Sequence, residues 1–280
     1  MPHVRKPKLI DERLALHADY LAQDPASLKG RWRTLLPGCR NVRVDLGCGK
    51  GQWTVAAARL RPDELVVGID CEPMCISFAA EHAAVGGVAS SGRAKRPEDG
   101  YVAPRNAVFA IGDAAMLPGF FALGEIVHLH MNFPTPFPRK KETQRRVVGV
   151  ERLAAYRPLL GEKGVLHLKT DSQPLFDYAA EQLAAAGYDI VASTRDLRSD
   201  ASGFDDVDLA VSEYERKLVM RGAKLHALRA VVREGAAPNV SCEPKSLYDY
   251  LPSDLDAIDY VPLGMENALV NMRNRKRNGH

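Results

Sequence analysis

The sequence of 280 residues lacks a long apolar run, a strong excess of charge of either sign and paired cysteines. No stretch of about 18 apolar residues occurs, so we predict no transmembrane helix. The first eight residues, MPHVRKPK, have no apolar core, which argues against a secretory signal and favours a cytoplasmic protein. The formal net charge of +3 excludes a highly basic, histone-like protein but leaves room for a local basic face.

Cysteine is also sparse: five are present, and none belongs to a Cys-x-x-Cys pair. An odd number of cysteines in a chain without a signal indicates reduced thiols. Cys71 and Cys75 have no histidine or cysteine partners at ligand spacing, so we predict no metal site. With 46% apolar residues the chain can bury a full core, and we expect one large domain with appendages.

One stretch organises the chain. An apolar run, Val42–Leu46, is followed by Gly47, Gly49 and Gly51 and then by Thr54–Leu60, which has helical composition. A strand, a glycine turn and a helix in this order are typical of a nucleotide-binding α/β sheet. The glycines let the backbone approach a ligand closely, and the helix N-terminus offers unpaired N–H groups.

The glycine spacing distinguishes two kinds of cofactor. A dinucleotide fold uses G-x-G-x-x-G, whereas this chain has G-x-G-x-G, which argues against a dehydrogenase. Asp45, at the end of the first strand, would repel a pyrophosphate and attract a cationic or zwitterionic ligand such as S-adenosylmethionine. Asp70 and Asp113 follow the next two apolar runs and are placed to bind a ribose diol and an adenine amino group. A tight turn without a ligand would explain the glycines but not the three acids.

Four later segments complete a predicted sheet. We predict an α/β, Rossmann-like, seven-stranded sheet of the class I methyltransferase type, with helices on both faces and an antiparallel last strand. The methyltransferase domain is expected at 41–233, with a surface insertion at 86–106. A basic arm with helices (1–40) precedes it, including helices at 11–22 and 27–34, and an extension with a basic tail (234–280) follows. The later strands are expected at 125–131, 164–171, 188–194 and 224–232.

A proline loop follows the fourth strand and reads NFPTPFP from Asn132 to Pro138. Its prolines fix an extended loop at the carboxyl edge of the sheet, where α/β folds bind ligands. Basic residues come next, among them Arg139, Arg145 and Arg146. A charge run is often only a solvated helix face. Beside a predicted catalytic mouth, we interpret it as a patch for an RNA phosphate backbone, contacted by Arg145 and Arg146.

Together these motifs resemble the bacterial tRNA (guanine-N(7)-)-methyltransferase family over about residues 5–233. Many methyltransferases share the glycine motif, whereas the proline loop, the Lys-Thr-Asp strand end and the Ser-Glu-Tyr-Glu segment are more specific. The segments that carry the resemblance are Arg5–Pro7, Tyr20, Lys29–Trp32, Asp45–Gly51, Gly68–Asp70, Gly112–Ala114, Asn132–Pro134 with Pro136, Lys169–Asp171, Phe176–Tyr178 and Ser212–Glu215.

The resemblance implies a cytoplasmic enzyme that uses S-adenosylmethionine to methylate position 7 of guanine in tRNA. We expect a monomer or a homodimer. The three acids match the cofactor-binding positions of the family, and we expect the glycines of the turn and the asparagine of the proline loop to bind the cofactor as well. The expected cofactor-binding residues are Asp45, Gly47, Gly49, Gly51, Asp70, Asp113 and Asn132.

The resemblance also implies the substrate residues. Arg139 stands where the family usually has a substrate-binding lysine, and Asp171 matches a substrate-binding aspartate. The family has a substrate-binding segment that reads Thr-x-Tyr-Glu. It is matched here by Ser212, Glu213, Tyr214 and Glu215, in which serine replaces threonine and keeps the hydroxyl group.

One position departs from the family, which reads Phe-Pro-Asp-Pro-Trp where this chain has Thr135 and Phe137. Thr135 therefore occupies the position of the aspartate that is thought to be catalytic in the family. Nitrogen 7 of guanine carries a lone pair and no proton, so in-line methyl transfer needs orientation more than a base. A carboxylate would stabilise the positive charge that arrives on the base. Asp171 can supply one, and we expect Asp171 and Thr135 to be the catalytic residues of a working enzyme.

Two alternatives remain open from the sequence. The loop that begins at Asn132 also resembles the Asn-Pro-Pro-Tyr loop of amino-group methyltransferases, so the target could be an exocyclic amine. Alternatively, the chain could be a tRNA-binding homologue that is catalytically impaired because of Thr135. The basic run and the Ser-Glu-Tyr-Glu segment argue against the first alternative, and the retained cofactor acids argue against the second.

Overall fold

The computed structural model describes residues 6–87, 99–161, 163–241, 243–262 and 264–277. Most of the predicted insertion at 86–106, Arg5 and the end of the basic tail lie outside these residues. The sheet runs in the order β3-β2-β1-β4-β5-β7-β6. Its strands are β1 Asn41–Leu46, β2 Glu64–Asp70, β3 Ala107–Ile111, β4 His128–Asn132, β5 Val165–Thr170, β6 Tyr188–Thr194 and β7 His226–Val232.

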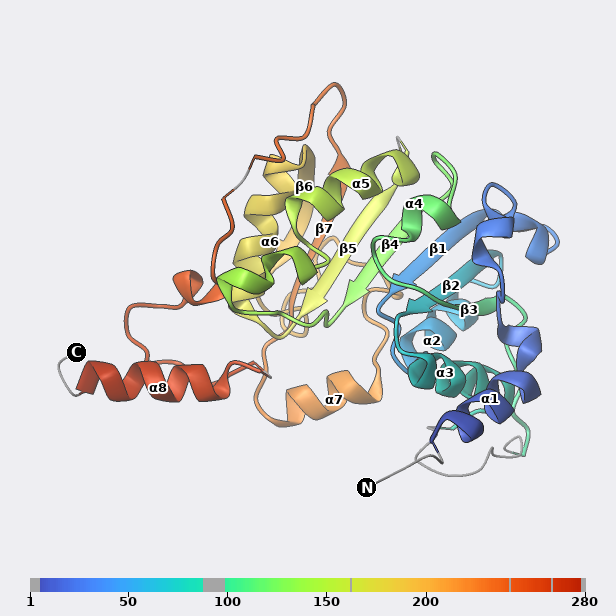
Figure 1. The fold of residues 1–280 in the computed structure, drawn as a ribbon, viewed down its shortest axis with the longest axis horizontal. Helices are drawn as coiled ribbons and strands as arrows, with labels where there is room; N and C mark the ends of the chain where they lie inside the picture. Colours follow the sequence, from blue (N-terminus) through green and yellow to red (C-terminus); the bar gives the residue numbers. More distant parts are fainter. Residues whose placement is uncertain (1–5, 88–98, 162, 242, 263, 278–280) are drawn as a thin grey trace.

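The predicted architecture is confirmed. Strands β1 to β5 pair in parallel, and β7 pairs antiparallel with both β5 and β6. The helices surround the sheet (Figure 1) and are α1 Lys6–Leu16, α2 Gln52–Leu60, α3 Pro73–Val85, α4 Leu117–Phe120, α5 Val150–Leu160, α6 Gln173–Ala185, α7 Glu213–Met220 and α8 Glu266–Arg277.

Alternating side chains of the strands form a core on each face of the sheet. In β2, Leu65 and Val67 join a cluster that contains Leu153 of α5 and Leu175 of α6. Val66 lies between them in the sequence and joins a second cluster with residues of α2 and α3. This period of two is what a strand buried on both faces requires, and it places helices on each side.

The central strands differ, because one of their faces is polar. Val42, Val44 and Leu46 of β1 belong to the cluster under α5 and α6. Arg43 and Asp45 therefore point to the opposite face, and both are buried. The same alternation in β4 and β5 places His130 and Lys169 beside them, so a row of polar side chains runs along this face toward the carboxyl edge.

The N-terminal helix was predicted at 11–22, but α1 begins and ends earlier, at Lys6 and Leu16. The helix ends at Leu16 because the residues that follow pair with the edge of the sheet. Leu21 forms a parallel bridge with Phe109 of β3, and the Ala22 N–H donates to the Phe109 carbonyl at 2.8 Å. The predicted helix at 27–34 is two 3₁₀ turns, Pro25–Leu28 and Trp32–Leu35, separated by Gly30 at φ +76°.

The C-terminal extension packs onto the main domain. Leu247, in the 3₁₀ turn Leu247–Tyr250, and Met265 both join the large core cluster under α5 and α6. Helix α8 follows Met265 and lies beyond the sheet (Figure 1). Arg273, predicted to belong to a basic tail, instead donates to the carbonyls of Leu255 and Ile258 within the extension. None of the described helices combines the length and apolar composition of a membrane span.

Candidate active site

The glycine turn between β1 and α2 has the conformation that its sequence demands. Gly47, Gly49 and Gly51 have φ of +80°, +53° and +72°, a region that side chains disfavour. A Cβ on Gly49 would meet nothing within 4 Å, so this part of the turn faces open space. A Cβ on Gly51 would lie 2.8 Å from Ala79 and 2.9 Å from Phe109, so Gly51 is required by packing.

Asp45 lies at the base of this turn and is buried. Its carboxylate accepts from the Thr54 hydroxyl at 2.6 Å and from the Asn132 side-chain amide at 3.3 Å. Burial raises the pKa of Asp45 to about 6, against the lowering effect of these hydrogen bonds. A buried carboxylate of this kind attracts a cationic ligand group, which would restore a counter-charge.

The other two predicted acids follow β2 and β3 at the same edge. The Asp70 carboxylate accepts from the backbone N–H of Gly49 and of Glu72, each at 2.9 Å, and so fastens the end of β2 to the glycine turn. Asp113 is exposed, and its carboxylate accepts from the Ala115 N–H at 2.7 Å. Asp113 therefore also caps its own turn, as an aspartate in this position often does.

A cavity of about 440 Å³ opens at the carboxyl ends of β1 and β4. Its volume lies within the range of small-ligand sites. The predicted residues that line it are Asp45, Gly47, Gly49, Asn132, Thr135, Ser212, Glu213 and Tyr214. The structure therefore brings together the glycine turn, the proline loop and the Ser-Glu-Tyr-Glu segment, while Gly51, Asp70, Asp113, Arg139 and Asp171 do not line this cavity.

Sequence reasoning missed Gln52, which also lines the cavity. Its side-chain carbonyl accepts from the Glu213 N–H at 2.9 Å, and its amide lies 3.4 Å from the Glu213 carboxylate. This reciprocal pair joins the start of α2 to the start of α7 across the cavity. No local motif could have revealed the pair, because 161 residues separate its members.

The proline loop is held in a strained conformation. Phe133 and Phe137 have φ of +51° and +46°, and they are the only non-glycine residues with positive φ in the described part of the chain. The Phe133 N–H donates to the Lys169 carbonyl of β5 at 2.7 Å. Strain of this kind persists only where the surroundings impose it, and it is common at binding sites.

The position of Arg146 contradicts the prediction made from the sequence. It was expected to contact phosphates, but its side chain is only 1% exposed. The guanidinium donates to the carbonyls of Phe137 and Lys245 at 2.8 to 3.0 Å and lies over the Tyr178 ring. It therefore holds the proline loop from inside. Arg145, in contrast, is exposed, and its guanidinium lies 4.1 Å from the Phe137 ring centroid.

Glu215 also differs from its expected role at the substrate. It is fully buried, and its carboxylate lies 2.8 Å from the Lys169 ammonium and also pairs with Arg198. Ser212 caps α7 by accepting from the Glu215 N–H at 3.1 Å. The helical turn then places Glu213 and Tyr214 at the cavity and Glu215 in the interior. Glu215 thus anchors α7 and does not face a ligand.

Lys169 connects several parts of this site. Its ammonium donates to the carbonyls of Asp208 and Ala210, at 3.1 and 3.0 Å. Burial, followed by the charge of Arg198, lowers the pKa of Lys169 to about 7. Lys169 therefore fastens the loop before α7 over the polar face of the sheet.

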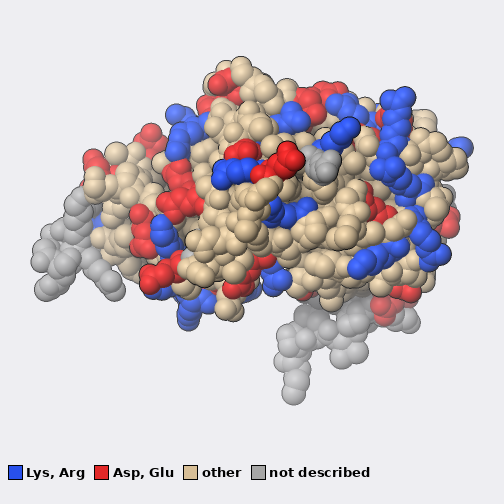
Figure 2. Space-filling view, turned by 90° about the horizontal axis from the view of Figure 1, so that it is seen from above, with Lys and Arg blue, Asp and Glu red and all other residues tan. Residues whose placement is uncertain are grey.

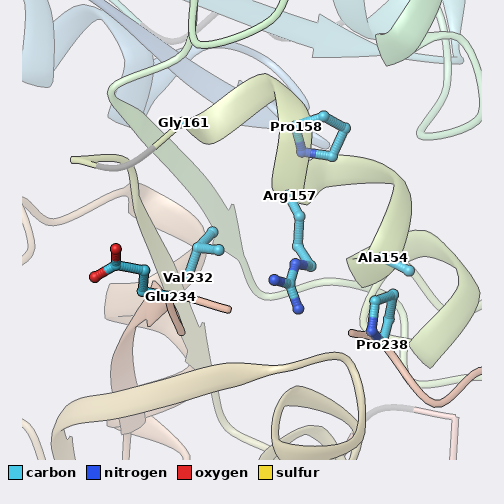
Figure 3. A pocket seen from close by; sticks show the side chains of 7 residues that line it. All are labelled: Ala154, Arg157, Pro158, Gly161, Val232, Glu234 and Pro238. Atoms are coloured by element: carbon cyan, nitrogen blue, oxygen red, sulfur yellow. The ribbon is translucent and has the colours of Figure 1, made fainter. Parts of the chain in front are cut away.

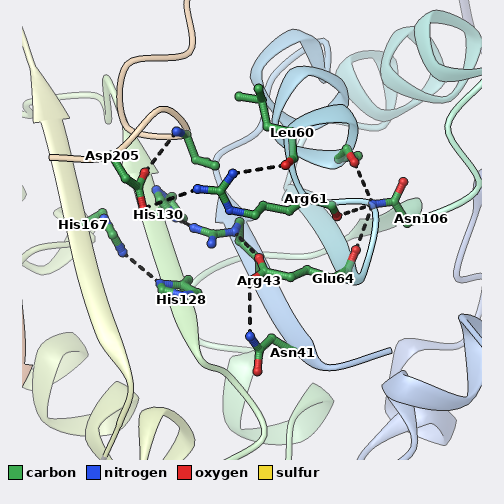
Figure 4. Close-up of polar contacts among 12 residues, drawn as sticks. Asn41, Arg43, Leu60, Arg61, Glu64, Asn106, His128, His130, His167 and Asp205 are labelled. Carbon is green, nitrogen blue, oxygen red and sulfur yellow. Dashed lines mark hydrogen bonds and ion pairs between the residues drawn. The ribbon is translucent and has the colours of Figure 1, made fainter. Parts of the chain in front are cut away.

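Behind the cavity, the polar face forms a buried network (Figure 4). Arg43 pairs with Glu64 at 2.7 Å and contacts His130 Nε2 at 2.6 Å. His128 contacts His167 at 3.1 Å, and His167 in turn pairs with Asp208. The histidine nitrogens of this group lie within 4.8 Å of one another, as metal ligands would. The adjacent guanidinium and the hydrogen bonds already made lead us to interpret it as a structural network.

A larger cavity lies elsewhere. It measures about 640 Å³ and is lined by residues of α5, the end of β7 and the start of the extension (Figure 3). Because β7 is antiparallel, this is the edge opposite the glycine turn. Arg157 projects into it, and its guanidinium donates hydrogen bonds to the carbonyls of Ala186 and Ala236 at 2.7 and 2.6 Å.

Seen from above the view of Figure 1, the molecular surface mixes basic and acidic side chains without a uniform basic field (Figure 2).

Comparison with known proteins agrees with this geometry. A family model described as "Putative methyltransferase" matches residues 40–228. The tRNA (guanine-N(7)-)-methyltransferase of Geobacillus kaustophilus is 30% identical, over 79% of this chain and 92% of its own length. That of Levilactobacillus brevis is 32% identical, over 75% and 88%. The crystal structure of the 16S rRNA methyltransferase KamB has the same fold, with a TM-score of 0.53, 17% identity, and coverage of 73% of this chain and 93% of KamB.

The region that the family model matches spans the glycine turn, the proline loop and the Ser-Glu-Tyr-Glu segment, which the structure brings to one cavity. The family model covers well over half of the chain. The chain therefore belongs to the tRNA (guanine-N(7)-)-methyltransferase family.

Proposed function

We propose that this protein transfers the methyl group of S-adenosylmethionine to nitrogen 7 of a guanine in tRNA. The observation that carries the proposal is the single cavity that the glycine turn, Thr135 of the proline loop and Tyr214 share. A cofactor held by the turn would then meet a base that enters past the loop. We expect the reaction to take place in the cytoplasm.

The residues present fit this cofactor. The open side of Gly47 and Gly49 leaves room for close backbone contact. Asp45 offers a buried negative charge toward the amino acid or sulfonium part. We propose that Asp70, whose carboxylate accepts from the Gly49 N–H of the glycine turn, also binds the ribose diol. When bound, S-adenosylmethionine supplies an electrophilic methyl group on a positively charged sulfur.

The protein's part in catalysis is mainly orientation. Phe133 and Tyr214 form an edge-to-face pair with ring centroids 5.6 Å apart, and both line the cavity. Aromatic side chains of this kind stack on bases taken out of a nucleic-acid helix. No proton has to leave nitrogen 7 before attack, so a base that is correctly aligned can react in line. The exposed Thr135 hydroxyl can hydrogen-bond the base but supplies no charge.

RNA binding is assigned to exposed basic residues near the proline loop. Arg139 and Arg145 are exposed on the loop and on the 3₁₀ turn Lys140–Arg145 that follows it. Guanidinium groups bind phosphates through paired hydrogen bonds. We therefore keep Arg139 and Arg145 as phosphate contacts and remove Arg146 from this set.

The test is methyl transfer from labelled S-adenosylmethionine to unmodified bulk tRNA, followed by nucleoside analysis. We expect 7-methylguanosine. Another methylated nucleoside would show that the proline loop presents an exocyclic amine or a different atom. Cofactor binding by calorimetry without any transfer would identify a tRNA-binding homologue in which Thr135 has abolished catalysis.

A further inference from the structure

The extension that follows β7 is tied to the proline loop. The Ser246 hydroxyl and the Leu247 N–H both donate to the Pro138 carbonyl, at 3.1 and 2.9 Å. The Lys245 carbonyl accepts from Arg146 at 2.8 Å, and Leu247 is fully buried. The family model ends at residue 228, so it assigns this segment no role.

Farther along the extension, Tyr260 contacts a predicted substrate residue. Its hydroxyl donates to the Asp171 carboxylate at 2.5 Å. Asp171 follows β5 at the carboxyl edge and is only 9% exposed. Burial raises the pKa of Asp171, and the hydrogen bond from Tyr260 acts in the opposite direction. Because each carboxylate oxygen has two lone pairs, Asp171 keeps acceptor capacity beyond this bond.

Asp171 and the extension enclose a second cavity of about 320 Å³. Lys224 and His226 of the main domain form one side of it, and Tyr250, Ile258 and Tyr260 of the extension form the other. The volume is at the lower end of the range for small-ligand sites. Its lining combines aromatic rings with polar groups, as sites for nucleobases do.

Helix α7 runs between this second cavity and the first. Tyr214, near the start of the helix, lines the cofactor cavity, and burial, followed by the charge of Asp171, raises the pKa of the Tyr214 phenol. Gly222, just beyond the end of the helix, lines the second cavity. A nucleotide bound against Asp171 would therefore lie next to the cavity assigned to the cofactor.

We propose that the C-terminal extension completes the substrate site, with Tyr260 holding the Asp171 carboxylate in position to bind the target guanine and residues 250–262 forming the outer wall. Guanine presents adjacent N–H donors at N1 and N2, which one carboxylate can accept together. Nitrogen 7 lies on the opposite side of the base, so this contact turns it away from Asp171. The inference rests on the proposed function, and it makes Tyr260 a positioning residue.

The experiment compares Tyr260→Phe with Tyr248→Phe in the full-length protein. Tyr248 lies in the same extension and packs on the main core, but it does not line either cavity. Both substitutions remove one phenol oxygen and keep the ring. We measure binding of unmodified tRNA in the presence of S-adenosylhomocysteine, and KM and kcat for tRNA across a pH series, with cofactor affinity and thermal unfolding as controls.

We expect Tyr260→Phe to weaken tRNA binding and raise KM about tenfold, the loss of one hydrogen bond to a charged group. Cofactor affinity should not change. The acid limb of kcat/KM should move to higher pH, because Asp171 loses the hydrogen bond that lowers its pKa. Tyr248→Phe should stay within about twofold of the wild type.

Equal behaviour of the two variants in tRNA binding and in pH profile would overturn the inference. A wild-type protein that transfers no methyl group to tRNA would instead contradict the proposed function. In that case the tRNA-binding comparison with S-adenosylhomocysteine still decides the role of Tyr260, because it needs no turnover.

Discussion

The guanidinium of Arg146 donates two hydrogen bonds to the backbone carbonyl of Phe137, at 3.0 and 2.9 Å. Phe137 is at φ +46°, a conformation that costs about 1–3 kcal/mol in a non-glycine residue. A buried side chain thus imposes the shape of the loop that borders the cofactor cavity. The neighbouring Arg145 lies outside, above the ring of the same phenylalanine.

Replacing Arg146 and replacing Arg145 should therefore have different effects on stability and on tRNA binding. We expect Arg146→Ala to lower the free energy of unfolding by about 3 kcal/mol, because several buried carbonyls lose their donor. Arg145→Ala should change stability by less than about 0.5 kcal/mol but weaken tRNA binding and reduce its salt slope by about one. Urea denaturation and tRNA titrations at several salt concentrations measure the two effects. A stable Arg146→Ala protein with weakened tRNA binding would contradict this division.

Cofactor affinity should depend on pH through Asp45. The pKa of this carboxyl is about 6 in the folded protein, so it is charged above that pH and neutral below it. A cationic ligand group favours the charged form. We expect the affinity for S-adenosylmethionine to fall below about pH 6, by up to about tenfold per pH unit.

The matched variant for this prediction is Asp45→Asn, which keeps the shape of the side chain. It should bind S-adenosylmethionine more weakly at neutral pH and without the acid dependence. Calorimetry of both proteins over a pH series is the measurement. An unchanged pH profile in Asp45→Asn would assign the dependence to another group.

Thr135 offers a gain-of-function test. It is exposed at the cofactor cavity and stands where the family has an aspartate. A carboxylate there would stabilise the positive charge that forms on guanine, so Thr135→Asp should raise kcat by up to about tenfold. Thr135→Asn serves as the control, since it has the size without the charge. Equal rates for the two variants would show that charge at this position does not limit the reaction.

The buried histidines should make the fold sensitive to acid. Burial lowers the pKa of His128 to about 2, and burial likewise lowers the pKa values of His130 and His167. The unfolded chain takes up protons below about pH 6.5, while the folded protein does not. The contribution of His128 to stability is therefore complete above that pH and is lost as the pH falls toward 2, by about 1.4 kcal/mol per pH unit, and His130 and His167 act in the same direction.

Replacing one member of the network tests this origin. His128→Gln should reduce the slope of unfolding free energy against pH between about 6 and 4, by the share of one histidine. Urea denaturation at each pH supplies the slope. If the slope stays the same, carboxylates and not the histidines control the acid sensitivity.

Local signals predicted much of this molecule. The glycine turn and the acids at the strand ends each depend on a few consecutive residues, and the three glycines have the positive φ that such a turn requires. Of the three acids, Asp45 lines the cavity, and Asp70 and Asp113 do not. The alternation of Val42, Arg43 and Val44 likewise fixes which face of β1 is polar. Such features follow from backbone geometry and period, which the sequence displays directly.

Tertiary structure alone decided the rest. Arg146 was predicted to contact phosphates and Glu215 to bind the substrate, yet both are buried, with partners that are distant in the sequence, Lys245 and Lys169. Tyr260 reaches Asp171 across 89 residues, and Gln52 reaches Glu213 across 161. The residues next to a charged or polar side chain in the sequence do not indicate its partner, because burial depends on which distant segments the fold brings together. The sequence thus determined the fold and the cofactor chemistry, whereas packing decided which charges face the ligand and which hold the site in shape.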